Sequence, residues 1–223
     1  MSGAFNLKEL YRGTILREGY PRNSIFFDQE HGRLLKEVLG YQGCQLSVYM
    51  PTFRGRTDDV EGDTYVEQVR SYLEVIDKGM QDDQILLLKL HPLVQKGLDL
   101  DNYRHIRPFP SELDTYDVLN ACDVLITDYS SVMYDFANTG RKIILFAYDL
   151  EDYMGHRGMY EDIRSYPFPI AVTPEEVLAE LQEPGGGADR EFLDKYCTFD
   201  RQKATRNICR HVLLGKYLCQ EHK

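Results

Sequence analysis

The chain has 223 residues, 43% of them hydrophobic and 28% charged, which is typical of a globular protein with a sizeable core. Its net charge of −10 argues against general affinity for nucleic acid, and no segment is apolar enough to span a bilayer. The five cysteines form no CxxC pair and are odd in number, so we expect reduced thiols in a cytoplasmic protein.

The first part of the chain predicts an alternation of helices and strands. In chain order we expect a helix over residues 2–17, a turn at 19–24, a helix over 31–39, a strand over 46–50, a helix over 65–76 and a strand over 85–90. The helix over 65–76 places Val69, Leu73 and Ile76 on one face, at amphipathic spacing. The strand over 85–90 is apolar throughout, which is typical of a strand covered on both faces.

The second part continues this alternation. We expect a short strand over 103–107, a helix over 117–121, strands over 124–126 and 143–147 with a helix between them, a polar and aromatic loop from 149 to 166, a strand near 170–172, a helix from 174 and a last helix over about 200–218. Thr173 and Pro174 fit the N-cap and first positions of a helix, and Gly140 fits a helix end. Residues 184–187 predict a flexible break.

Alternating strands and helices with fully apolar strands predict an α/β fold built on a Rossmann-like, doubly wound parallel sheet. Three loops should then emerge together at the carboxyl edge of the sheet, where such sheets bind ligands. These loops carry Thr52, Phe53 and Arg54, then Lys89, His91 and Pro92, and then residues 127–131. The combination of Arg, His and Ser outlines an anion site.

The sequence Asp-Tyr-Ser-Ser at 128–131 joins a strand to a helix. A helix N-terminus presents free N–H groups and a positive dipole end, both suited to a phosphate. The alternative is that Ser130 only caps the helix. His91 likewise could be a strand-end histidine bonded to backbone, and Arg54 could pair with a carboxylate of the acidic segment that follows it. We predict surface positions for His105, His156, His211 and His222.

Several motifs, in register over almost the whole chain, resemble the carboxyl half of the CDP-glycerol glycerophosphotransferases. They are GYPRN from residue 19, MPTFR from 50, LKLHP from 88, DVLITDYSSVMYDF from 123, FAYDLEDY from 146 and DRQKATRNI from 200. Members of this family build teichoic acids and related bacterial polymers, and close relatives use CDP-ribitol. One departure is Asn23-Ser24, where the family usually shows Asn-Asp.

The resemblance implies the donor-binding half of a GT-B fold. It makes residues 1–24 an inter-domain linker, 25–183 the nucleotide-donor-binding domain, and 184–223 the flexible break and carboxyl-terminal helix. It also implies transfer of glycerol phosphate from CDP-glycerol to a teichoic-acid-like or capsular polymer, with no metal or cofactor. The alternatives are a CDP-ribitol ribitolphosphotransferase and a non-catalytic nucleotide-binding or interaction module.

Carried over residue by residue, the resemblance implies that Ser130 and Ser131 cap a helix whose N–H groups meet the pyrophosphate. It makes His91 the catalytic candidate beside the phosphates, Arg54 a source of positive charge, and Asp128 the residue that orients the Arg54 loop. The predicted binding set is completed by Thr52, Lys89, Thr127 and Arg157.

The resemblance implies two partners beyond the donor, which are a lipid-linked polymer acceptor and an amino-terminal GT-B half that this chain lacks. The last predicted helix sets basic residues against an apolar face, a pattern that fits packing against protein or peripheral contact with the inner face of the membrane. The basic residues are Arg201, Lys203, Arg206, Arg210 and Lys216.

Overall fold

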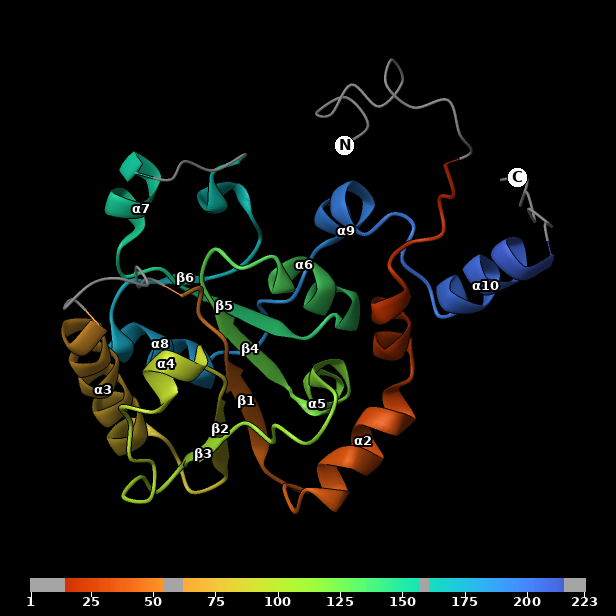
Figure 1. Ribbon diagram of the computed structural model, residues 1–223. Coiled ribbons are helices and arrows are strands. Elements are labelled where there is room, and N and C mark those ends of the chain that lie inside the picture. The colour runs from red at the N-terminus through yellow and green to blue at the C-terminus, as the bar shows by residue number, and fades with distance from the viewer. Residues whose placement is uncertain (1–14, 54–61, 157–160, 215–223) are drawn as a thin grey trace.

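In the computed structural model, which describes residues 15–53, 62–156 and 161–214, six parallel strands form one sheet (Figure 1). The strands are β1 (Gln45–Tyr49), β2 (Gln84–Leu88), β3 (Ile106–Pro108), β4 (Val124–Thr127), β5 (Lys142–Phe146) and β6 (Ile170–Ala171). Their order across the sheet is β3-β2-β1-β4-β5-β6, the order of dinucleotide-binding Rossmann folds. The predicted doubly wound parallel sheet is confirmed.

Helices cover both faces of the sheet (Figure 1). One face carries α3 (Gly62–Gly79), α4 (Pro92–Gln95) and α8 (Pro174–Gln182). The other carries α5 (Thr115–Ala121) and α6 (Val132–Phe136), and α2 (Gln29–Val38) packs on α5. The remaining elements are the 3-10 turns η1 (Pro21–Phe27), η2 (Ala137–Thr139) and η3 (Ile163–Ser165) and the helices α7 (Leu150–His156), α9 (Arg190–Tyr196) and α10 (Ala204–Leu214).

Two hydrophobic cores lie on the two sides of the sheet, because successive strand residues point to opposite faces. On β4, Leu125 packs with the α5–α6 side, whereas Val124 and Ile126 pack with the α3–α8 side. All three side chains are buried, so β4 is covered on both faces, as expected for the interior of a parallel sheet.

Two predicted helices show why the sequence folds as it does. In α3 the predicted apolar face is confirmed, since Val69, Leu73 and Ile76 are buried against the sheet. In α8 the Thr173 hydroxyl accepts from the Glu176 N–H at 3.2 Å, and the Glu176 carboxylate accepts from the Thr173 N–H at 3.3 Å. This reciprocal capping box confirms the predicted start of α8.

Among the described residues, the helices α4, α7 and α9 were not predicted from the sequence. Residues 150–156 form α7, although a loop was predicted there; Glu151 and Asp152 in its first turn favour a helix N-terminus. The helix α9 follows the predicted break and buries Phe192, whose ring stacks on Tyr134 with centroids 5.7 Å apart. The break itself runs beside β5, where the Ile143 N–H donates to the Gly186 carbonyl at 3.0 Å.

The strand β3 begins later than predicted because a side chain captures the backbone before it. The Asp77 carboxylate accepts from the N–H groups of Arg104 and His105 at 3.0 and 2.7 Å, which holds these residues in a turn. The prediction that His105 is a surface residue is wrong. Its side chain is buried, and its ring Nδ1 lies 3.1 Å from the Gln84 carbonyl oxygen.

A buried carboxylate on α6 holds η1 in place. Asp135 lies 3.0 Å from the Arg22 guanidinium, accepts from Asn23 Nδ2 at 2.9 Å and accepts from the Tyr116 hydroxyl at 2.7 Å. Burial, reinforced by the bond to Asp135, raises the pKa of Tyr116 and keeps this phenol a donor. Residues from η1, α5 and α6 therefore meet at one carboxylate.

A second carboxylate extends this network to the start of the carboxyl-terminal segment. Asp200 accepts from Asn23 Nδ2 at 2.7 Å, from Asn138 Nδ2 at 2.9 Å and from the Tyr20 N–H at 2.8 Å. We call Asp135, Asp200 and Asn23 the scaffold network. It joins the GYPRN segment, the end of α6 and the DRQKATRNI segment, which are far apart in the sequence.

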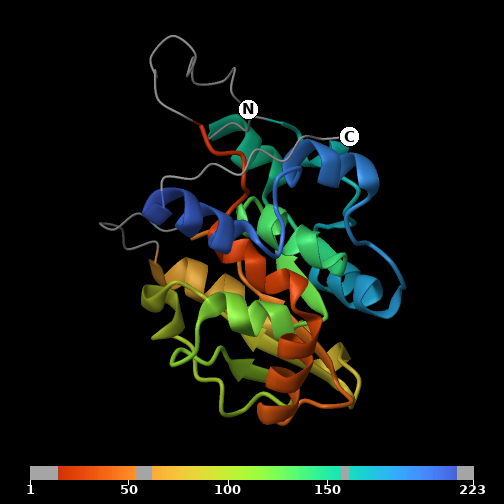
Figure 2. The ribbon, with the colours of Figure 1, turned by 90° about the vertical axis from the view of Figure 1, so that its right-hand side faces the viewer.

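The helix α10 lies at the rim of the domain, beside η1 (Figures 1 and 2). Thr205 makes the junction, since its hydroxyl donates to the Pro21 carbonyl and lies 3.0 Å from the Ser24 hydroxyl. Val212, Leu213 and Leu214 at the end of α10 are exposed. Among residues 15–53, 62–156 and 161–214, no helix has the length and apolar character needed to cross a membrane.

Candidate functional site

The candidate site lies where β1 and β4 run side by side. The chain leaves β1 toward α3 on one face and leaves β4 toward α6 on the other. This reversal is the topological switch point, and open α/β sheets bind ligands in the crevice outside it. The loops after β1, β2 and β4, which carry the predicted site residues, all emerge at this edge.

Asp128 ties the loop after β1 to the loop after β4. Its buried carboxylate accepts from the Thr52 N–H at 2.9 Å, from the Thr52 hydroxyl at 2.7 Å and from the Tyr129 N–H at 2.6 Å. Next to it, the buried Thr127 hydroxyl donates to the Met50 carbonyl at 2.6 Å. The two loops at the switch point are thus fixed to each other by side chains from the end of β4.

The start of α6 presents the two serines differently. Ser131 occupies the N-cap position and is exposed, but its side chain makes no capping hydrogen bond. The Ser130 hydroxyl lies 3.5 Å from the Val132 N–H, which is a long contact for a cap. Neither hydroxyl therefore contributes a strong cap to α6, so helix capping alone does not account for both serines.

The loop after β2 carries Lys89 and His91, and an aromatic ring lies against each of them. The His91 ring stacks on Phe53 with centroids 4.2 Å apart, and Lys89 Nζ lies 4.2 Å from the centroid of Phe109. Burial lowers the pKa of Lys89, an effect that Asp114 opposes. A phosphate at this edge would therefore meet a cation that has already lost part of its water.

The helix α7 is fixed to the same edge through a residue of the DYSS segment. Tyr129 stacks on Tyr153 of α7 with centroids 3.7 Å apart, and its hydroxyl donates to Asp149 at 3.0 Å. Figure 1 shows α7 beyond the carboxyl end of the sheet, above the strands. The sequence placed Phe53 and Tyr129 on loops of this edge but indicated no role for either of them.

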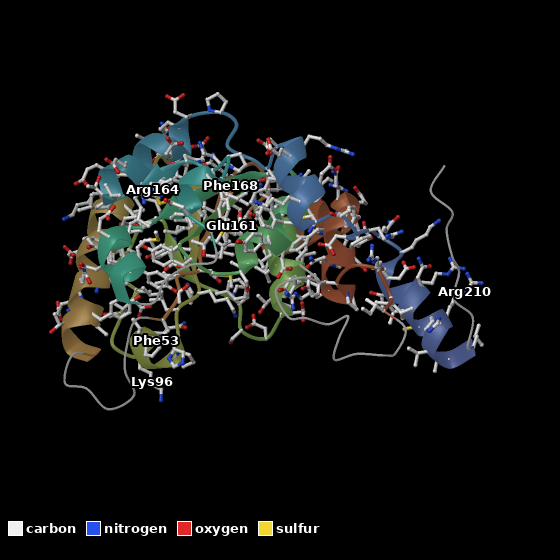
Figure 3. The ribbon with its side chains drawn as sticks, turned by 90° about the horizontal axis from the view of Figure 1, so that it is seen from above. Phe53, Lys96, Glu161, Arg164, Phe168 and Arg210 are labelled. Carbon is white, nitrogen blue, oxygen red and sulfur yellow. The ribbon has the colours of Figure 1, made fainter. Side chains whose placement is uncertain are left out.

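The structure therefore brings Thr52, Lys89, His91 and residues 127–131 to one edge. Arg54 and Arg157 lie outside the described residues. Figure 3 shows Phe53 and Lys96, which follows α4, on one side of the domain and Arg210 of α10 on the opposite side. The ligand contacts of all these residues stay predictions.

A depression of about 480 Å³ lies elsewhere, beside β3, and it shares none of the predicted site residues. Its lining includes Asp99, Asp101, Tyr103 and Arg107. The Arg107 guanidinium already donates to the carbonyls of Tyr103 and Ile106 at 3.1 and 2.8 Å. No described cation there points to an anionic ligand, so we place the candidate site at the switch point.

The strand order and the polar loops at the switch point define a Rossmann-like domain with a candidate ligand edge around β1 and β4. Residues 1–214 match the family described as CDP-Glycerol:Poly(glycerophosphate) glycerophosphotransferase, so the chain belongs to that family. The resemblance seen in the sequence motifs is thereby confirmed.

Among curated relatives, the chain is 32% identical over 87% of its length to a teichoic acid poly(glycerol phosphate) polymerase of Staphylococcus epidermidis, of which it covers 29%. It is 30% identical over 93% of its length to the teichoic acid glycerol-phosphate transferase of Staphylococcus aureus, of which it covers 56%. The chain thus spans only part of the relatives it matches.

Among solved structures, the wall teichoic acid polymerase TagF aligns with a TM-score of 0.74 at 29% identity, over 90% of this chain and 52% of that chain. A TagF variant soaked with CDPG aligns with a TM-score of 0.73 over the same shares of both chains. The fold described here therefore corresponds to about half of TagF, in agreement with the predicted half of a two-domain enzyme.

Proposed function

We propose that this chain supplies the donor-binding half of a transferase that moves glycerol phosphate from CDP-glycerol to a teichoic-acid-like or capsular polymer. The observation that carries the proposal is the bond network at the switch point. Asp128 and Thr52 fix two loops there, and the loop with Lys89 and His91 emerges beside them. Family membership favours CDP-glycerol as the donor.

In this proposal each group acts on the donor's phosphates. The N–H groups at the start of α6 and the hydroxyls of Ser130 and Ser131 contact the pyrophosphate. Lys89 offers positive charge, and both Lys89 and His91 offer N–H donors to the phosphoryl oxygens, where negative charge is distributed during transfer. His91 is the catalytic candidate, because such a transfer depends on positioning and charge stabilisation more than on covalent chemistry.

A second donor, CDP-ribitol, has a specific observation in its favour. The chain is 30% identical over 76% of its length to a protein of Bacillus spizizenii named teichoic acid poly(ribitol-phosphate) polymerase. Glycerol and ribitol differ in the number of hydroxyl groups beyond the phosphate. Discrimination must therefore come from groups that face this alditol end.

The partners in this proposal are an amino-terminal GT-B half and a lipid-linked acceptor. The exposed end of α10 offers a surface for one of them, since Val212, Leu213 and Leu214 leave an apolar patch uncovered. We assign this patch to the amino-terminal half. Arg206 and Arg210, which are exposed on the same helix, make an anionic lipid surface the alternative. Sedimentation with vesicles that contain anionic lipid separates the two.

Calorimetric titration of the chain with CDP-glycerol, CDP-ribitol, CDP and UDP tests the donor site. We expect saturable binding of the cytidine ligands and weaker binding of UDP. His91→Ala and Ser130→Ala should both weaken binding, and Ser130→Ala should leave the unfolding free energy nearly unchanged because its cap contact is long. Failure of a folded chain to bind any CDP-alditol would favour a module without a donor site.

A further inference from the structure

Phe53 joins the fixed core of the domain to an exposed histidine. Its ring is half-buried and packs against the core on the α3–α8 side of the sheet. The same ring stacks on His91, with centroids 4.2 Å apart and 26° between the ring planes. His91 itself is exposed. A core-anchored ring thus lies nearly flat against an imidazole at the surface.

The backbone next to each of the two rings is held by hydrogen bonds. Phe53 directly follows Thr52, whose N–H donates to Asp128 at 2.9 Å. The His91 carbonyl accepts from the N–H groups of Val94 and Gln95 at 2.9 and 3.1 Å, which anchors His91 at the start of α4. Because both backbone segments are held by hydrogen bonds, the stack is a fixed contact between the loop after β1 and the loop after β2.

The stack with Phe53 involves a face of the His91 imidazole and not its nitrogens. Both ring nitrogens lie in the plane of the ring, whereas the stack uses only a face, so the contact with Phe53 consumes no donor of His91. The stack does restrict the rotamers of the exposed His91 side chain. The conformational entropy of this side chain is therefore already reduced in the free protein, and less of it is lost when a ligand binds. Lys89 has a comparable support, with its Nζ over Phe109.

We infer that Phe53 is a positioning residue for His91, whose imidazole it holds in the plane from which a ring nitrogen donates to the phosphate of the donor. This inference rests on the proposed function. Phe53 acts through His91 and makes no contact with the donor itself. Its contribution should therefore exist only while the imidazole is present.

A double-mutant cycle tests this dependence, with CDP-glycerol titrated into the chain by calorimetry. Phe53→Leu should weaken binding roughly fivefold, the value of an aromatic pair of about 1 kcal/mol. Phe53→Tyr keeps the ring and should keep the affinity. In the His91→Ala background, Phe53→Leu should change nothing further. In proton NMR spectra the His91 ring signals should lie upfield in the wild type and in Phe53→Tyr, and move downfield in Phe53→Leu.

Three results would overturn the inference. Equal weakening by Phe53→Leu in the His91 and His91→Ala backgrounds would show that Phe53 acts on the donor or on its loop. Unchanged affinity of Phe53→Leu would show that the stack does not matter for binding. Absence of binding by the folded wild type would overturn the proposed function and this inference together. In the other two outcomes the wild type still binds CDP-glycerol, so the proposed function stands.

Discussion

Asp128 and Asp135 are both buried carboxylates, and they stand before and within the same short helix, α6. Thr52 and Tyr129, which donate to Asp128, belong to two loops at the carboxyl edge of the sheet. The partners of Asp135 belong to η1 and α5, which build the body of the domain. Asp128 fixes loops at the candidate site, and Asp135 fixes elements of the fold.

Burial alone therefore does not show whether a carboxylate fixes loops at the candidate site or elements of the fold. Asp128 and Asp135 are distinguished by the location of the segments that donate hydrogen bonds to them. The loops fixed by Asp128 lie at the carboxyl edge of the sheet, so its bonds hold the loops of the candidate site in place. The segments fixed by Asp135 have their other ends inside the domain, so its bonds contribute to folding stability. Substitutions should divide along the same line.

The largest effect should come from Asp135→Ala. We expect the free energy of unfolding to fall by about 3 kcal/mol, because Arg22, Asn23 and Tyr116 would all lose a charged acceptor at one buried point. Urea unfolding followed by circular dichroism measures the loss.

The matched control for Asp135→Ala is Asp194→Ala. Asp194 pairs with Arg190 at 3.0 Å on the exposed face of α9. This substitution should cost about 0.5 kcal/mol or less, as exposed pairs within a helix do. Equal costs for the two substitutions would contradict a structural role for the scaffold network.

Gly19→Ala should have the next largest effect, about 2 kcal/mol, because it combines strain with a clash. Gly19 has φ +78°, and a Cβ there would lie 2.4 Å from the Phe199 carbonyl oxygen and 2.6 Å from Asp200 Oδ1. The scaffold network would have to open to admit a methyl group. Urea unfolding of the variant measures the cost.

Gly40→Ala isolates the strain from the clash. Gly40 has φ +80°, but a Cβ there would meet nothing within 4 Å. We expect a cost of about 1 kcal/mol, the conformational part alone. If Gly19→Ala proved no worse than Gly40→Ala, the close approach of Gly19 to Asp200 would not constrain the fold.

Asp128→Asn should act mainly on the ligand edge. An amide has the size of the carboxylate but turns an NH₂ group toward one of the donors at Thr52 and Tyr129. We expect a stability loss of about 1 kcal/mol and roughly tenfold weaker binding of CDP-glycerol. Calorimetry of Asp128→Asn beside Asp135→Ala tests the division. Tight binding by Asp128→Asn would show that the two carboxylates do not differ in this way.

Much of the fold could be predicted from the sequence, because periodicity reports burial directly. The amphipathic spacing of α3 and the apolar run of β2 identified a covered parallel sheet. The helix α9 was missed because its stability comes from Phe192 packing on residues distant in the sequence, such as Tyr134 and Phe168. The start of β3 was misplaced because Asp77, from another element, takes the backbone donors before it.

The position of the candidate site could be predicted from the sequence, but the side-chain contacts within it could not. Strand ends in a parallel sheet share one edge, so the three loops could be placed together. The motifs did not reveal which of their residues face inward. Thr127 and Asp135 both stand in the DVLITDYSSVMYDF segment, yet one joins β4 to the loop after β1 and the other anchors η1. Such assignments depend on partners from other segments.

Cys197 offers the finest probe of the scaffold network. Its buried thiol donates to the Tyr134 carbonyl at 3.3 Å, and burial, with the nearby charges of Asp200 and Asp135, raises the pKa of Cys197 to about 12. At pH 8 its thiolate is therefore scarce, and because Cys197 is also buried we expect it to react with iodoacetamide far more slowly than the exposed Cys209. Mass spectrometry of digested samples resolves the two sites.

Asp135→Ala should speed the reaction of Cys197 alone, because an opened network exposes the thiol and removes a neighbouring negative charge. Equal acceleration at Cys209 would mean that the whole domain loosens, and that Asp135 does not hold η1 and the segment at Asp200 as a local unit.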